Sequence, residues 1–183
     1  MQFLKKMLAT KQHTYNRISL QVQHSIEEPV TNYQNYLVTK AKLPNSFQVW
    51  YSSQILHFWL VLHPMQIEPK LAQTFIDLTF MDIEDRIARM DLPQQKIMKQ
   101  LWEQCLGTTR AYDQCLSSDI NADHGKLDDL LKSALKRNVF QNTEHPKLLN
   151  ESVQYVRKNL SYTFSLGLED LQSKLIFPQS ISL

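Results

Sequence analysis

The sequence predicts an all-α fold: a single compact domain of six or seven helices with a basic N-terminal extension. Apolar residues recur at helical spacing along most of the chain, and no stretch alternates like a strand over more than a few residues. Only 3 of the 183 residues are glycine, where average usage would give about a dozen. Tight hairpins and phosphate-binding loops depend on glycine, so this scarcity disfavours β-sandwiches, Rossmann domains and P-loop nucleotidases.

Positive charge is concentrated at the start of the chain. Residues 1–26 contain four basic residues and no acid, whereas the rest contains 16 basic and 18 acidic residues. A basic, amphipathic start is typical of an organelle-import segment, but also of an ordinary basic first helix. We expect a basic extension over residues 1–30, either import segment or tail, and a helical domain over residues 31–183. Whether residues 1–26 are cleaved stays open, and four charges do not predict sequence-specific nucleic-acid binding.

Proline and capping residues then divide the body into helices. Pro44-Asn45-Ser46 precedes a central helix over about residues 47–63, which is apolar on more than one side. Its apolar run, residues 55–62, is far shorter than the ~20 residues of a membrane span, so we expect a buried helix. The next helix covers about residues 70–90, and its pairs Asp82–Arg86 and Asp85–Arg89 predict a solvent-exposed, salt-bridged face.

The second half continues in the same way. Pro93 starts a helix that Gly107 bends or ends, and Asp123 caps the following one. Thr143 is expected to cap the next helix, with Pro146 in its first turn, and a short last helix follows Gly167. Leu130 is expected on the inner face of the helix that Asp123 caps, and Phe164 on the inner face of the helix that Thr143 caps.

The segment from Asp119 to Gly125 is the acidic stretch most like a metal site. It lacks the glycine and the bidentate glutamate of a calcium-binding EF-hand loop, which favours a helix-capping turn instead. The spacing of Asp119 and Asp123 is also that of the magnesium-diphosphate motif in helical isoprenoid synthases. Those enzymes carry two such motifs and this chain carries one, so a small isoprenoid-type enzyme is an alternative and not the main hypothesis.

The remaining chemistry-bearing residues predict no enzyme, no metal and no cofactor. None of the six histidines forms HExxH, and His57 and His63 lie about 120° apart on a helix. There is no GxSxG motif, and Cys105 and Cys115 form no CxxC pair, which suits a reducing compartment. For His57 two interpretations remain open, a hydrogen-bonded core histidine and a residue that faces a partner.

One string of residues carries a family resemblance. It consists of Leu43-Pro44-Asn45-Ser46-Phe47-x-x-Trp50, followed by Leu56-His57-x-Trp59. This string resembles the opening motif of the ubiquinol–cytochrome c chaperone family, whose members are assembly factors for the cytochrome bc1 complex. Similar segments follow in the family's order over about residues 40–175: Phe80-Met81-Asp82-x-x-x-Arg86, Gly107 with Ala111-Tyr112-Asp113, Leu131-x-x-Ala134-Leu135-x-Arg137-Asn138-Val139, and Tyr155-Val156-Arg157.

The resemblance implies a non-enzymatic chaperone on the matrix side of the mitochondrial inner membrane. Such proteins bind newly made cytochrome b, act with a small helical partner chaperone and sit near the exit of the mitochondrial ribosome, with peripheral membrane contact. A stable helical accessory subunit of a large mitochondrial assembly remains an alternative. One departure is His63, where family members commonly have an arginine, so a charge contact made there would be altered or pH-dependent.

Seven motif residues are expected to contribute to partner binding: Trp50, His57, Trp59, Arg86, Tyr112, Arg137 and Asn138. For Arg86, Arg137 and Asn138 the alternative is a structural role, in which the side chain caps a helix end or pairs with a nearby acid. A protein that binds nascent membrane helices should also expose an apolar patch. Trp102, Tyr51 and Phe140 are candidates for such a patch, although aromatic residues of this kind more often belong to a core.

Overall fold

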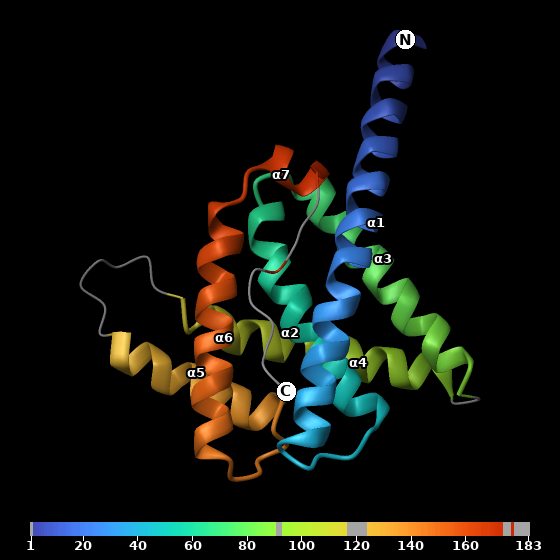
Figure 1. The fold of residues 1–183 in the computed structure, drawn as a ribbon. Coiled ribbons are helices and arrows are strands. Elements are labelled where there is room, and N and C mark those ends of the chain that lie inside the picture. Colours follow the sequence, from blue (N-terminus) through green and yellow to red (C-terminus); the bar gives the residue numbers. More distant parts are fainter. Residues whose placement is uncertain (1, 91–92, 117–123, 174–176, 178–183) are drawn as a thin grey trace.

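Seven α-helices account for most of the chain that the computed structural model describes, namely residues 2–90, 93–116, 124–173 and 177 (Figure 1). These residues contain no strand, so the all-α prediction is confirmed. In chain order the helices are α1 (Gln2–Thr39), α2 (Phe47–Met65), α3 (Pro69–Ala88), α4 (Gln94–Asp113), α5 (His124–Asn138), α6 (Pro146–Ser165) and α7 (Leu168–Ser173).

Helix α2 is the centre of the fold, because it packs against α1, α3, α4 and α6. Ser46 is its N-cap, as the sequence predicts, and the side-chain oxygen of Ser46 accepts a hydrogen bond of 3.4 Å from the backbone N–H of Val49. Nearly every side chain from Val49 to Met65 is buried. A helix surrounded by other helices must be apolar on all sides, which explains why its sequence shows no single apolar stripe.

Helix α1 runs through the boundary that the sequence suggests near residue 30. Its backbone is helical from Gln2 to Thr39, and the start of the helix extends beyond the other helices (Figure 1). From Tyr15 onward one face of α1 is buried, with apolar side chains at helical spacing: Tyr15, Ile18, Val22, Ile26, Val30, Tyr33 and Leu37. The second half of the expected extension, residues 15–30, therefore contributes to the hydrophobic core.

Helix α4 passes through Gly107 to Asp113, so of the two predicted alternatives, a bend or an end of the helix at this glycine, the end is wrong. A glycine in a helix interior costs about 1 kcal/mol relative to alanine, and the packing of Leu101, Cys105 and Tyr112 against the core outweighs that cost. Gly167, by contrast, does lie at a junction, between α6 and α7.

The last three helices depart from the predicted pattern in detail. The N-cap of α6 is His145 and not Thr143, although Pro146 is the first helical residue as expected. Leu130 is exposed, and Phe164 is 57% exposed because its ring lies at the surface against His63. Asp119 and Asp123 lie outside the described residues. Among the described helices, none combines the length and apolar composition that a membrane span requires.

Candidate functional site

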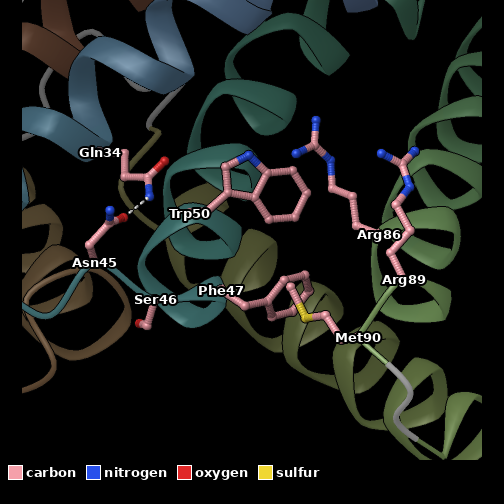
Figure 2. Close-up of a pocket in the computed structure, with 8 residues that line it drawn as sticks. All are labelled: Gln34, Asn45, Ser46, Phe47, Trp50, Arg86, Arg89 and Met90. Carbon is pink, nitrogen blue, oxygen red and sulfur yellow. Dashed lines mark hydrogen bonds between the residues drawn. The ribbon is translucent and has the colours of Figure 1, made fainter.

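A groove of about 400 Å³ opens where the end of α1, the start of α2 and the end of α3 meet (Figure 2). Its described lining residues come from three separate parts of the sequence: Gln34 from α1, Asn45, Ser46, Phe47 and Trp50 from the start of α2 and its cap, and Arg86, Arg89 and Met90 from the end of α3. Two of the sequence motifs that carry the family resemblance therefore share one surface cavity.

The start of α2 positions the aromatic side of the groove. Because Ser46 caps the helix, Phe47 is its first residue, and Trp50 lies one turn later on the same face. The ring centroids of Phe47 and Trp50 are 5.3 Å apart, and both side chains are partly exposed. This arrangement provides an apolar floor at the protein surface.

The end of α3 positions the charged side. The Nε of Arg86 donates a hydrogen bond of 3.0 Å to Oδ2 of Asp82, one turn earlier in the helix. The guanidinium carbon of Arg86 lies 4.3 Å from the centroid of the Trp50 ring, within cation–π range. The predicted structural role of Arg86, pairing with a nearby acid, is thus realised, and the same side chain also lines the groove.

A second pocket, of about 240 Å³, shares Gln34, Trp50 and Arg86 with the groove. Its lining includes the carboxylates of Glu27 and Asp82. The Trp50–Arg86 pair therefore separates a pocket that contains acids from a groove whose described lining contains two arginines and no acid.

Three of the seven predicted partner-binding residues are in the interior, which corrects that expectation. His57, Trp59 and Tyr112 are at most 1% exposed, so a partner cannot reach them in this conformation. Trp50 and Arg86 come together at the groove. The other two, Arg137 and Asn138, end α5 and are absent from the groove lining; the Arg137 side chain is exposed and that of Asn138 is half-buried.

The geometry around His57 confirms the interpretation as a core histidine. One ring nitrogen, Nδ1, donates a hydrogen bond of 2.7 Å to the backbone oxygen of Ser53, so Nε2 accepts one of 2.6 Å from the hydroxyl of Tyr155. Burial lowers the pKa of His57 to about 4, because the charged ring would lose its hydration. His57 is therefore neutral at physiological pH and links α2 to α6.

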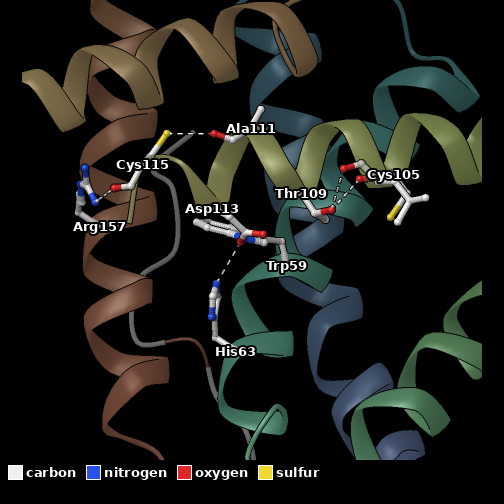
Figure 3. Close-up of polar contacts among 9 residues, drawn as sticks. Trp59, His63, Cys105, Thr109, Ala111, Asp113, Cys115 and Arg157 are labelled. Carbon is white, nitrogen blue, oxygen red and sulfur yellow. Dashed lines mark hydrogen bonds and ion pairs between the residues drawn. The ribbon is translucent and has the colours of Figure 1, made fainter. Parts of the chain in front are cut away.

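His63, the residue at which the sequence departs from the family pattern, faces the carboxylate of Asp113 (Figure 3). Its Nε2 lies 3.5 Å from Oδ1 of Asp113, an ion-pair distance but without hydrogen-bond geometry. Burial lowers the pKa of His63, and the nearby Asp113 carboxylate offsets this only in part. The ion pair between His63 and Asp113 therefore forms only when the pH falls far enough to protonate His63, which agrees with the expected pH dependence.

Arg157, in the last of the family motifs, joins two other parts of the chain. Arg157 donates from Nε to Oδ1 of Asp128 at 2.8 Å. It also donates from Nη1 to the backbone oxygen of Cys115 at 3.1 Å (Figure 3). One side chain on α6 thus connects α5 with the end of α4. This contact and the His57–Tyr155 bond give the motif residues of α6 a structural role.

The predicted apolar patch is present only in part. Trp102 is 40% exposed and packs edge-on against Phe80, with centroids 4.6 Å apart. Tyr51 and Phe140 are buried, so neither contributes to a surface patch. No cluster of His, Cys, Asp or Glu side chains that could hold a metal ion occurs among the described residues.

Sequence reasoning missed most of the groove. The sequence predicts a salt bridge between Asp85 and Arg89, yet Arg89 makes no ion pair in the described part of the chain. Met90, the next residue, is exposed. Both side chains line the groove. A signal was present, because Arg86 and Arg89 are three residues apart and so share a helix face.

Comparison with known proteins gives consistent results. A family model described as ubiquinol-cytochrome C chaperone matches residues 39–176. The chain is 28% identical over 149 residues to ubiquinol-cytochrome c reductase complex assembly factor 1 of Mus musculus, covering 77% of this chain and 48% of the relative. It is 27% identical over 146 residues to the Saccharomyces cerevisiae protein CBP3, mitochondrial, covering 73% and 41%. The chain therefore spans about half the length of the mouse relative and less than half the length of the yeast relative.

A solved structure has the same fold. The crystal structure of the Cbp3 homolog from Brucella abortus matches with a TM-score of 0.73 and covers 97% of both chains. At 20% sequence identity this match concerns the fold alone.

Proposed function

Because the chain belongs to the ubiquinol-cytochrome C chaperone family, we propose that it is an assembly chaperone of the cytochrome bc1 complex, complex III. In this role it binds newly made cytochrome b together with a small helical partner chaperone and releases both as assembly proceeds. The family is named for a chaperone and not for a catalyst, and we assign the chain no catalytic step. Its action is binding, through the surface that its helices present.

The observation that carries the proposal is the match of residues 39–176 to the family model, which contains nearly the whole groove. The mouse and human relatives are both named ubiquinol-cytochrome c reductase complex assembly factor 1. The yeast relative is named as mitochondrial, which supports a mitochondrial location. We place this chain on the matrix side of the inner membrane, near the ribosome exit, as part of the same proposal.

The test is removal of the protein from its native source, followed by native gel analysis of the respiratory complexes. We expect loss of assembled complex III with unchanged ATP synthase, which serves as the control on the same gel. Restoration of the full chain should restore complex III. Normal complex III assembly in the deletion strain would contradict the proposal.

Affinity purification of the tagged full chain then distinguishes the chaperone from an accessory subunit. A chaperone should retain unassembled cytochrome b and a small partner protein under gentle conditions. Recovery of mature complex III alone would instead identify a stable subunit and would count against the chaperone.

A further inference from the structure

The groove has an uneven charge distribution. Its described lining contains the guanidinium groups of Arg86 and Arg89 and no carboxylate. Arg86 is partly neutralised through its Nε by Asp82, which lines the neighbouring pocket. Arg89 is exposed and forms no ion pair in the part of the chain that the structure describes. The groove is therefore complementary to a negatively charged group.

The orientation of Arg86 leaves its best donors unused. The single bond to Asp82 uses Nε, and no hydrogen bond of the described residues uses the two terminal nitrogens. The Trp50 ring, whose centroid lies 4.3 Å from the guanidinium carbon, restricts the guanidinium further. A fixed guanidinium with two parallel N–H groups available suits a carboxylate, which accepts both bonds at once.

Beside the arginines lies an apolar surface of the right kind for a side chain. The rings of Phe47 and Trp50 form the floor, and the flexible thioether of Met90 points toward Phe47 from the end of α3 (Figure 2). Aromatic residues combined with methionine are typical of protein surfaces that accept apolar side chains of partners.

The side-chain amides of Gln34 and Asn45 line the groove on the side away from Arg89 (Figure 2), and they favour a peptide over a simple anion as its ligand. Gln34 donates from Nε2 to Oδ1 of Asn45 at 2.9 Å (Figure 2). No other hydrogen bond of the described residues uses the carbonyl oxygen of Gln34 or the amide group of Asn45. One acceptor and one donor thus remain, which match the N–H and C=O of a peptide backbone. An inorganic anion such as fully ionised phosphate has no donor for Gln34.

From these contacts we propose that the groove binds a short segment of a partner protein in which an acidic residue is next to, or one residue from, an aromatic or branched apolar residue. The carboxylate lies on Arg86 and Arg89, and the apolar side chain lies on Phe47 and Trp50. The inference rests on the proposed function, since it names the chemistry that this chaperone recognises in a client or partner chain.

The experiment selects phage-displayed random heptapeptides on the immobilised full chain and, in parallel, on the double variant Arg86→Gln/Arg89→Gln. We expect the wild type alone to enrich sequences with Asp or Glu within two positions of an aromatic or branched apolar residue. A capped peptide of the enriched sequence is then measured by fluorescence anisotropy. The double variant, and separately a Glu-to-Gln or Asp-to-Asn change in the peptide, should weaken binding about tenfold, corresponding to about 1.4 kcal/mol.

The matched control is Arg110→Gln, which removes an exposed arginine from the last turn of α4 as Arg86→Gln does from that of α3. It should leave peptide affinity unchanged, and circular dichroism should show all variants folded. Enriched sequences without an acid, equal affinity in the double variant, or no enrichment above it would each overturn the proposal. Displacement of the peptide by inorganic phosphate, with no loss when its apolar residue becomes serine, would show a plain anion site and also overturn it.

This result is separable from that of the proposed function. If the deletion strain loses complex III and the double variant restores it as well as the wild type does, the groove inference fails and the chaperone role stands. If complex III assembles without the protein, the chaperone role fails whatever the peptide experiment shows.

Discussion

The indole N–H of Trp59, in the middle of α2, donates a hydrogen bond of 2.8 Å to Oδ1 of Asp113, the last residue of α4. Trp59 is 1% exposed, whereas the Asp113 side chain is about half exposed. A buried donor thus reaches an acceptor at the protein surface, where His63 also faces the same oxygen. Two segments distant in sequence are joined by this single carboxylate.

Removal of that acceptor should destabilise the fold. In Asp113→Ala the indole N–H of Trp59 loses its partner, and an unsatisfied buried donor costs about 1–3 kcal/mol. We expect the lower end, about 1 kcal/mol, because water can enter where the half-exposed Asp113 side chain was. The measurement is the midpoint of urea unfolding. Asp113→Asn keeps a carbonyl acceptor and is the matched control; a loss as large as that of Asp113→Ala would contradict the hydrogen-bond explanation.

The stability of the protein should fall as the pH is lowered because of His57. The pKa of His57 is about 4 in the folded protein and about 6.5 when unfolded. The unfolded chain therefore binds the proton more tightly. The stability contribution is complete above pH ~6.5 and is lost progressively toward pH 4, by about 3 kcal/mol.

His57→Gln should remove this part of the pH dependence. The free energy of unfolding, measured between pH 7 and 4 by urea titration, should change less steeply in the variant than in the wild type. Comparison of slopes avoids confusion with the overall loss of stability that a core substitution causes. His13→Gln changes an exposed histidine and is the control. Equal slopes in wild type and His57→Gln would show that the buried ring does not provide the linkage.

The sequence predicts the helices better than it predicts the groove. Local signals mark the starts of helices, as Ser46 does for α2 and Pro146 for α6, because caps and prolines act within one turn. The groove depends on contacts between distant residues such as Trp50 and Arg86, which no local pattern encodes. The interior positions of Trp59 and Tyr112 were missed because an aromatic residue on a helix suits a core and a partner surface equally well.

The glycine inside α4 should be a position where stability is easily gained. An alanine Cβ at Gly107 would meet no atom within 4 Å, and the backbone there has no positive φ. Alanine loses less backbone entropy on folding than glycine, so Gly107→Ala should stabilise the protein by about 0.5–1 kcal/mol. The measurement is thermal unfolding followed by circular dichroism. An unchanged or lower melting temperature would indicate that the helix bends at this residue.

The second half of the expected N-terminal extension should be essential for folding, whereas the first residues should not be. A shortened protein that begins at residue 31 lacks Ile18, Val22, Ile26 and Val30, each at most 1% exposed. Full burial of one such side chain contributes about 1.5–3 kcal/mol, and a domain has only about 5–15 kcal/mol in total. We therefore expect this shortened protein to be unfolded or to lose most of its stability.

The matched control begins at residue 11 and so shortens α1 only at its start, the end of the helix that extends beyond the other helices (Figure 1). Its urea midpoint should be close to that of the full chain, since Tyr15 is the first side chain that is buried among those described. Cooperative unfolding with an unchanged midpoint in the protein that begins at residue 31 would contradict the prediction. That outcome would mean that the remaining helices form a stable core without the first thirty residues, despite the apolar surface that α2 and α3 share with α1.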